Sequence, residues 1–255
     1  MATSMGVGGV SEVGPDGLTR VGPHRVSDDE IEGAVFDVDG TLLDTMPLFY
    51  PGWPKTAESP EFNMKCTEYD FYKLAGKPLC DIVKALHKEQ KGCEASEEFV
   101  QAFLKKKVEW SHSDEKAKGH PPPIQAIIDI AREYKKRGIK VAIATSGLAE
   151  FVVPHLAHAG IDDLVPPEHR VYAKEVKKGK PDPEIFLEAA RRLGVDPKKC
   201  RAFEDAESGL MSAAAAGMET IDVTYHKEYP MIEGLKMAKE DQVRDRTWIN
   251  DLVPN

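Results

Sequence analysis

The chain has 255 residues, of which 41% are hydrophobic and 30% charged, and its formal net charge at pH 7 is -9. This length supports one large domain or two modest ones with a sizeable core. The negative charge argues against nucleic acid as a partner, because affinity for a phosphate polymer depends on clustered Lys and Arg.

No stretch of the sequence approaches the roughly 18 consecutive apolar residues of a membrane helix, and the N-terminus lacks the order of a signal peptide. We therefore expect no membrane association. The four cysteines are far apart and form no CxxC pair, which favours reduced thiols over a zinc site. These features predict a cytoplasmic protein, with import into an organelle as the alternative.

The N-terminal residues 1–28 contain six glycines and little apolar periodicity. This composition predicts a flexible tail. From Gly33 the pattern changes to "GAVFDVDG", a short apolar run that closes on a glycine. We interpret this run as the first strand of the core.

A helical segment follows the first strand. Runs such as "SEEFVQAFLKKKVEW" place apolar residues four positions apart, which predicts an inserted helical domain over residues 45–119. Within it, Lys105–Lys107 is interpreted as a solvated helix face. The run "MPLFYPGWP" at residues 46–54 is interpreted as a hydrophobic hinge between this domain and the core, with direct substrate contact as the alternative.

Strands and helices alternate again after the triple proline at residues 121–123. The later strand-like runs are "IKVAIATSG" (139–147), "HRVYA" (169–173), "KCRAFEDA" (199–206) and "ETIDVTY" (219–225). This alternation predicts a doubly wound parallel sheet with helices on both faces, built from residues 29–44 and 120–255. His155 and His158, near the end of one predicted helix, are interpreted as surface residues.

Polar residues come directly after three of these strands, and a lysine lies in the loop before a predicted helix. They are Asp37 and Asp39 after the first strand, Thr145 and Ser146 after the second, Glu204 and Asp205 after the fourth, and Lys180 in "KKGKPDPEIF". In an open parallel sheet, ligands bind in the crevice at the carboxyl ends of the strands. Crowded carboxylates require a positive partner there. Mg²⁺ fits, because it prefers oxygen ligands from one or two carboxylates, waters and a substrate phosphate.

Four stretches carry a family resemblance: "DVDGTLLDT", "ATSG", "GKPDPEIF" and "FEDAESGLMSAAAAGM". In this order and spacing the chain resembles the haloacid dehalogenase-like superfamily of phosphohydrolases, in the branch around β-phosphoglucomutase with a helical cap. The match runs from about Gly33 to Thr224. The resemblance implies an α/β fold with a Rossmann-like core and an inserted α-helical cap.

The resemblance also implies catalytic and metal-binding roles. Asp37 corresponds to the nucleophile that attacks phosphorus and forms an aspartyl-phosphate. Asp39 corresponds to the general acid that protonates the leaving oxygen and then activates water, and its main-chain carbonyl also reaches the metal. Glu204 and Asp205 complete the Mg²⁺ site beside Asp37.

The remaining predicted contacts are to phosphate and substrate. Thr145 and the Ser146 amide correspond to groups that hold phosphoryl oxygens at a helix N-terminus. Lys180 supplies the fixed positive charge that balances Asp37 and the transferring group. In the cap, "YKLAGKPL" resembles the loop that faces the site, so Lys73 and Lys77 are candidate substrate contacts.

The second carboxylate decides between the chemistries of the family. Asp39 favours phosphate esters over haloacids, because a leaving alkoxide needs a proton. Mutases of the family carry a cap histidine and a cap arginine at positions that here correspond to Phe49 and Leu79. We therefore expect a Mg²⁺-dependent phosphatase that hydrolyses a small phosphomonoester, such as a sugar phosphate. The alternatives are a sugar-phosphate mutase and a catalytically silent protein that binds a phosphorylated ligand.

Overall fold

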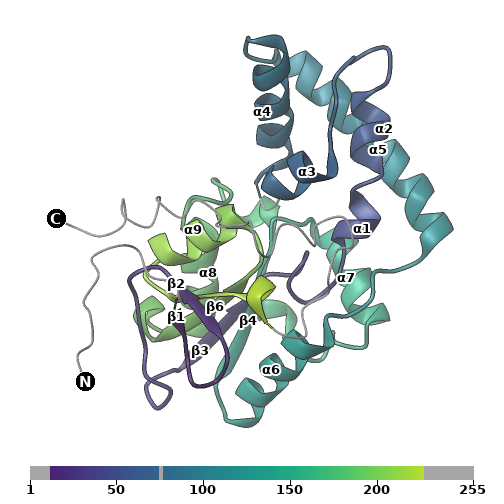
Figure 1. The fold of residues 1–255 in the computed structure, drawn as a ribbon. Helices are drawn as coiled ribbons and strands as arrows, with labels where there is room; N and C mark the ends of the chain where they lie inside the picture. The colour runs from purple at the N-terminus through teal and green to yellow at the C-terminus, as the bar shows by residue number, and fades with distance from the viewer. Residues whose placement is uncertain (1–11, 75–76, 227–255) are drawn as a thin grey trace.

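The structure is a computed structural model and describes residues 12–74 and 77–226. Within these residues one seven-stranded sheet has the order β1-β2-β7-β6-β3-β4-β5 (Figure 1). The strands are β1 (Glu12–Val13), β2 (Thr19–Val21), β3 (Gly33–Phe36), β4 (Lys140–Ala144), β5 (Arg170–Val171), β6 (Cys200–Glu204) and β7 (Glu219–Asp222). Strands β3 to β7 pair in parallel, whereas β1 and β2 pair antiparallel at one edge.

The helices fall into an inserted group and a group that flanks the sheet. The inserted helices are α1 (Met46–Phe49), α2 (Gly52–Ala57), α3 (Glu68–Leu74), α4 (Leu79–Lys91) and α5 (Glu97–Lys118). The flanking helices are α6 (Gln125–Lys136), α7 (Ala149–His158), α8 (Glu184–Leu193) and α9 (Glu207–Ala215). Short 3-10 helices are η1 (Pro167–His169), η2 (Ala173–Glu175), η3 (Pro197–Lys199) and η4 (Val223–Tyr225). No described helix has the length and apolar character needed to cross a membrane.

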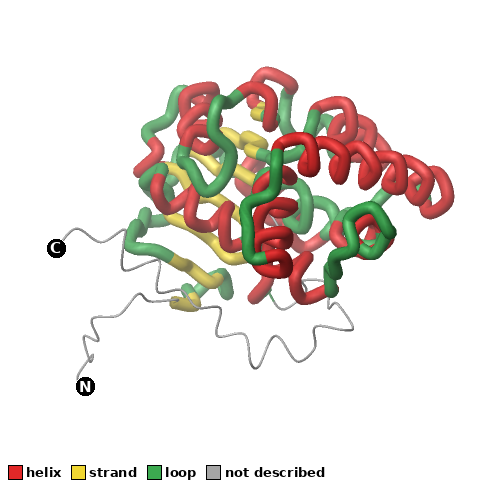
Figure 2. The backbone as a smooth tube through the Cα atoms, turned by 90° about the horizontal axis from the view of Figure 1, so that it is seen from above, coloured by secondary structure: helices red, strands yellow, loops and turns green. Residues whose placement is uncertain are grey.

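Alternate residues of each core strand point to opposite faces of the sheet, as the strand geometry requires. On β3, Phe36 packs in one core cluster with α6 and α7, and Val35 packs in another with α8 and α9. Both faces are therefore buried under helices, and Figure 2 shows these helices on either side of the strands. This arrangement confirms the predicted doubly wound parallel sheet.

The order of the strands creates the crevice for a site. The chain runs outward from β3 through β4 to β5, and then crosses back to β6 on the other side of β3. The loops that follow β3 and β6 therefore leave in opposite directions. In open α/β sheets this switch point is where ligands bind.

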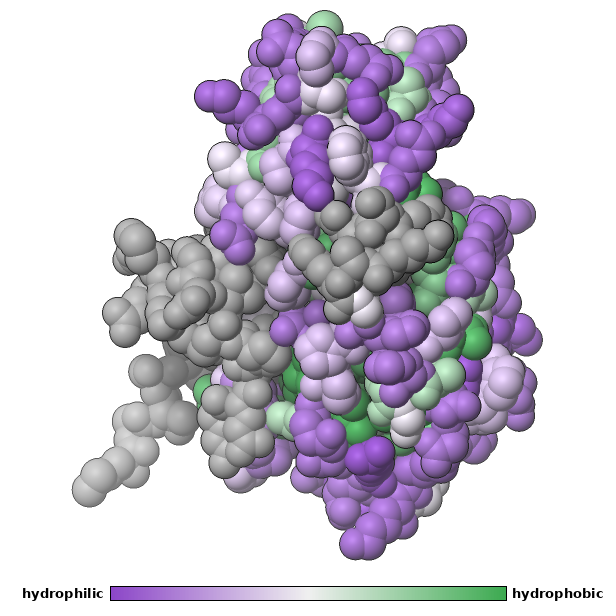
Figure 3. All heavy atoms as spheres, turned by 90° about the vertical axis from the view of Figure 1, so that its right-hand side faces the viewer, coloured by the Kyte–Doolittle hydropathy of each residue, from purple (hydrophilic) through white to green (hydrophobic). Residues whose placement is uncertain are grey.

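The inserted helices form a cap with its own apolar core, above the sheet in Figure 1. Trp53 lies at the centre of this core, with its ring centroid 5.9 Å from that of Phe103 and 6.2 Å from that of Phe71. On the face drawn in Figure 3, the outer surface of the cap is mainly hydrophilic. The inserted α-helical cap predicted from the sequence is confirmed.

The prediction of a flexible tail over residues 1–28 is wrong for residues 12–28. Strands β1 and β2 form a hairpin, and β2 pairs with β7, so that Arg20 lies opposite Ile221. All three residues of β2 are buried. The hairpin extends the sheet beyond its last parallel strand. Residues 1–11 lie outside the described part of the chain.

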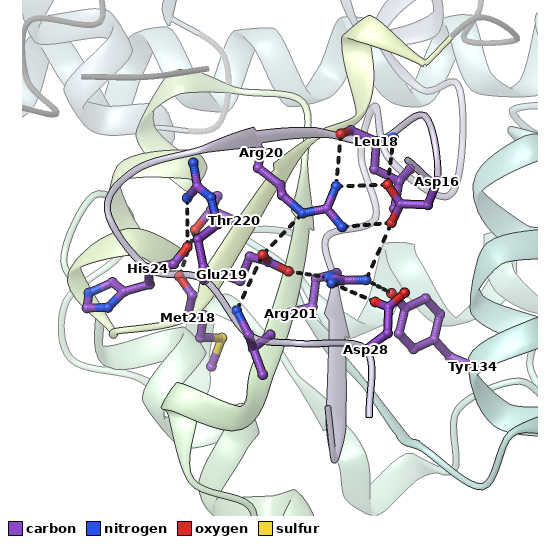
Figure 4. A network of polar contacts seen from close by, with 12 residues as sticks. Asp16, Leu18, Arg20, His24, Asp28, Tyr134, Arg201, Met218, Glu219 and Thr220 are labelled. Atoms are coloured by element: carbon purple, nitrogen blue, oxygen red, sulfur yellow. Dashed lines mark hydrogen bonds and ion pairs between the residues drawn. The ribbon is translucent and has the colours of Figure 1, made fainter. Parts of the chain in front are cut away.

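Buried ion pairs attach this hairpin to the sheet (Figure 4). We call this group the arginine cluster: Asp16, Arg20, Asp28, Arg201 and Glu219. Arg20 donates to Asp16 at 2.8 and 2.7 Å and to Glu219 Oε1 at 3.2 Å. Arg201, opposite Glu219 in the β6–β7 ladder, donates to Glu219 Oε2 and to Asp28. Glu219 thus joins arginines from two strands that are far apart in the sequence.

Candidate active site

Three of the predicted residues meet at the carboxyl ends of β3 and β6. The Lys180 ammonium donates to Asp37 Oδ1 at 2.6 Å and to Glu204 Oε1 at 2.5 Å. All three side chains are buried. We call Asp37, Lys180, Glu204 and the neighbouring Asp205 the catalytic cluster. Elements separated by more than 140 residues thus converge on the nucleophile predicted from the sequence.

Three carboxylates of this cluster are placed to hold a metal ion. Asp37, Glu204 and Asp205 each offer an oxygen atom, and these atoms lie within 4.8 Å of one another. Three buried acids exceed the single charge of Lys180, so a further cation would be stabilised among them. The donors are all oxygen, which suits Mg²⁺. The Asp39 side chain is outside this group, so its predicted metal contact rests on its main-chain carbonyl.

Two glycines make room for the acids. Gly40 has a φ of 87°, and a Cβ atom there would lie 2.3 Å from Asp205 Oδ2. At Gly209, in the first turn of α9, a Cβ atom would lie 1.8 Å from Glu204 Oε1. Side chains at either position would displace a carboxylate of the catalytic cluster. The motif "DVDGT" indicated a turn at Gly40, whereas the packing role of Gly209 was not predicted.

The electrostatic environment differs between the two aspartates after β3. Burial raises the pKa of Asp37, Lys180 opposes this shift, and the nearby acids Glu204 and Asp205 reinforce it. Burial also raises the pKa of Asp39, against the effects of the adjacent Thr45 side chain and of positive charges that include Lys107. Positive charge near Asp37 therefore favours its ionised form, whereas a raised pKa suits Asp39 to a role as general acid.

The predicted phosphate-binding residues follow β4. Ser146 lines the cavity described below. Thr145 is buried, and its hydroxyl accepts a hydrogen bond from the Gly147 N–H at 2.9 Å. A Cβ atom at Gly147 would lie 3.2 Å from both Asp39 Oδ2 and Thr145 Oγ1, so this turn runs directly beside the Asp39 carboxylate.

A cavity of about 220 Å³ separates the cap from the core. Asp37, Asp39 and Asp205 line it from the core, and Lys77, a candidate substrate contact, lines it from the cap. The side chain of Lys73, on α3, lies outside the described part of the structure. The acids are therefore open to a small ligand held between the two domains.

Two residues that the sequence assigned to the surface lie at this cavity. Lys107 on α5 is buried and lines the cavity, so the interpretation of Lys105–Lys107 as a solvated face is wrong for this residue. His155 on α7 is also buried, lines the cavity and contacts His120, with 3.0 Å between the two Nδ1 atoms. The surface assignment holds for His158, which is exposed.

The hinge run at residues 46–54 has features of both interpretations, packing within the cap and lining the cavity. Met46, Phe49 and Trp53 all line the cavity. Met46 and Trp53 belong at the same time to the apolar core of the cap, against which Phe49 also packs. This run therefore both packs the cap and presents apolar surface toward a bound ligand.

The fold, the buried acid and lysine cluster, and the capped cavity define a phosphoryl-transfer enzyme of the α/β class. The profile of the haloacid dehalogenase-like hydrolase family matches residues 34–223, and the chain belongs to this family. It is 31% identical over 202 residues to a phosphorylated carbohydrates phosphatase of Thermotoga maritima, covering 77% of this chain and 86% of that protein. It is also 31% identical over 194 residues to a fructose-1-phosphate phosphatase of Escherichia coli, covering 75% of this chain and 95% of that protein.

Among solved structures, the β-phosphoglucomutase of Clostridium difficile matches with a TM-score of 0.61 and 25% identity, covering 74% of this chain and 83% of that one. The resemblance found in the sequence motifs is thus confirmed. The chain is a phosphohydrolase of the haloacid dehalogenase-like family.

Proposed function

We propose that the protein hydrolyses a small phosphomonoester in a Mg²⁺-dependent reaction through an aspartyl-phosphate at Asp37. The observation that carries this proposal is the buried Asp37 carboxylate at a cavity wall, held by Lys180 and flanked by two further acids. Both phosphatases compared above have names that indicate phosphate esters as substrates.

The first step transfers the phosphoryl group to the enzyme. An Asp37 carboxylate oxygen attacks phosphorus, and the bond between phosphorus and the ester oxygen breaks. Asp39 donates a proton to the departing oxygen, so that the product leaves as a neutral alcohol. Lys180 holds Asp37 in place and compensates part of the negative charge. Thr145 and the Ser146 amide are proposed to hold the phosphoryl oxygens.

The second step regenerates Asp37. Asp39, now ionised, takes a proton from water, whose oxygen attacks the phosphorus of the aspartyl-phosphate. The bond from phosphorus to Asp37 breaks, and inorganic phosphate leaves. Mg²⁺ bound by Asp37, Glu204, Asp205 and the Asp39 main-chain carbonyl would neutralise the negative charge that attends phosphoryl transfer.

The direct test is phosphate release from para-nitrophenyl phosphate with and without Mg²⁺, compared between the parent protein and Asp37→Asn. We expect release that requires both Mg²⁺ and Asp37. Equal and negligible rates for the two proteins would instead support the silent binding protein.

A sugar-phosphate mutase is the second candidate, supported by the similarity to the C. difficile β-phosphoglucomutase. The two positions that distinguish mutases, Phe49 and Leu79, both line the cavity and are apolar. Incubation with a panel of sugar phosphates separates the two functions. Formation of a phosphosugar isomer without free phosphate would establish the mutase and exclude the hydrolase.

A further inference from the structure

The cavity has a polar end and an apolar remainder. Its acids, Asp37, Asp39, Glu204 and Asp205, all come from the core, where the phosphoryl group is to be transferred. Away from them, the walls are apolar on both sides: Phe49 and Leu79 come from the cap and Phe151 comes from α7 of the core. The part of a substrate beyond its phosphate therefore faces hydrocarbon and aromatic surface.

The polar groups that the described cap residues add to this lining are two lysines, Lys77 and Lys107. The Lys107 ammonium lies over the rings of Phe49 and Trp53, 5.4 and 5.6 Å from their centroids. Ammonium groups donate hydrogen bonds but cannot accept them. Apart from the acids, the core adds the polar side chains of Ser146 and His155 to the lining. A polyol in this space would therefore lose water from several hydroxyl groups and find few acceptors among the described lining residues, which is unfavourable for each unpaired group.

The same walls favour an apolar group. Phe49 and Phe151 are only partly buried, and Leu79 is 43% exposed, so a ligand would remove their apolar surface from water. Such removal is favourable in proportion to the area covered. An apolar cavity of about 150 Å³ accommodates benzene in another protein. The cavity of about 220 Å³ therefore has room for one six-membered ring and a phosphoryl group.

We infer that the preferred substrate is a phosphomonoester whose alcohol part carries a flat, apolar ring. This inference rests on the proposed function and narrows its substrate class. Phe49 and Phe151 provide aromatic surface from the cap and from the core, and Leu79 closes the apolar wall. The catalytic cluster supplies the chemistry, and these three residues select the leaving alcohol.

The test compares benzyl phosphate with glucose 6-phosphate in the Mg²⁺-dependent release of inorganic phosphate. Both esters lose a primary alcohol and carry the same phosphate charge, so their intrinsic reactivity does not decide the result. We expect kcat/KM for benzyl phosphate to be at least about tenfold higher. An equal or lower kcat/KM for benzyl phosphate would overturn the inference and leave the proposed hydrolase intact. Release from neither ester, with the parent no better than Asp37→Asn, would overturn the hydrolase as well.

Variants on one helix show whether the walls cause the preference. Phe151→Ala should lower kcat/KM for benzyl phosphate about fivefold or more, mainly through KM, with little effect on glucose 6-phosphate. Val153→Ala is the matched control, because Val153 is exposed on the same helix and lies outside the cavity lining. Leu79→Ala repeats the test at an exposed position where folding is not at risk. Equal losses with both esters in Phe151→Ala and Leu79→Ala would contradict the assignment.

Discussion

Two buried ionic clusters lie at opposite ends of strand β6. Arg201 near the start of the strand belongs to the arginine cluster, and Glu204 at its end belongs to the catalytic cluster. In the arginine cluster, both carboxylate oxygens of the buried Glu219 accept from guanidinium groups. In the catalytic cluster, three buried carboxylates lie beside one ammonium group: Lys180 pairs with Asp37 and Glu204, and the third acid, Asp205, accepts a hydrogen bond from the Thr41 hydroxyl.

The difference in charge balance separates structural from catalytic use of the same strand. Buried charges are tolerated when opposite charges and hydrogen bonds compensate them, as around Glu219. The catalytic cluster retains an excess of negative charge, which a divalent cation and the approach of a phosphoryl group to Lys180 would use. We therefore expect the arginine cluster to govern stability, and the catalytic cluster to govern activity and metal binding.

The largest effect is expected from a substitution that breaks the catalytic cluster. Asp37→Asn keeps the size of the side chain but removes the nucleophile, so kcat should fall by at least about 1,000-fold. Because burial and the neighbouring acids disfavour a charge on Asp37, its replacement by a neutral amide should leave the metal-free variant no less stable than the parent. Phosphate release and thermal unfolding measure the two effects. A variant that retains most of its activity would exclude Asp37 as the nucleophile.

Breaking the arginine cluster should lower the stability of the protein but leave its activity nearly unchanged. Glu219→Gln leaves Arg20 and Arg201 without the carboxylate that joins them, and removal of one partner from a buried ion pair costs about 3–5 kcal/mol. Urea unfolding measures this loss, whereas kcat/KM of the folded protein should change little. Glu32→Gln, in the exposed pair with Lys199, is the control and should stay within about 0.5 kcal/mol of the parent. If Glu219→Gln lowers the free energy of unfolding no more than Glu32→Gln does, the hairpin is held by other contacts.

The two clusters also differ in how far the sequence predicted them. Asp37, Glu204 and Asp205 were found because carboxyl ends of parallel strands meet at one edge of a sheet. The pairing of Arg20 with Glu219 joins residues 199 positions apart across an antiparallel edge, and the glycine-rich segment around Arg20 has no periodicity that predicts a strand.

The sequence analysis did not place Lys107 and His155 at the cavity, although the helical pattern contained a signal for Lys107. Lys107 follows Val100 and Phe103 by seven and four positions, which places it on the buried stripe of α5. Its charge led to a surface assignment. For His155, periodicity gives the side of the helix but not the contact with His120, because that contact depends on how the linker after the cap returns to the core.

Metal removal is expected to affect one cluster only. A ligand that binds the folded state alone adds about 2.7 kcal/mol at a concentration 100-fold above its Kd. Mg²⁺ should therefore raise the Tm of the parent and of Glu219→Gln by similar amounts. Asp205→Asn should lose most of this increase. Equal stabilisation of Asp205→Asn by Mg²⁺ would place the metal elsewhere.

The excess charge also predicts how stability depends on pH. Burial raises the pKa of Asp37 above its ordinary value of 3.8, so without metal the folded state retains a proton that the unfolded state has released. The stabilisation from this proton is complete below the ordinary pKa and is lost as the pH rises through the raised one. Without Mg²⁺, the parent should become less stable relative to Asp37→Asn as the pH increases. Thermal unfolding of both proteins over the same pH series measures the difference, and a gap that closes with rising pH would contradict the prediction.

The smallest expected effect concerns the charge that the cap adds to the site. Lys107 is one of the positive charges that oppose the raised pKa of Asp39, so Lys107→Met should raise this pKa further. Asp39 must be protonated to donate to the leaving oxygen, and activity falls at pH values above its pKa. The alkaline limb of the profile of kcat/KM against pH should therefore move upward, by less than about one unit. Lys105→Met, exposed on the same helix, should leave the limb unchanged. An unchanged limb in Lys107→Met would show that the cap contributes shape to the site but not charge, and that the core alone sets the pKa of Asp39.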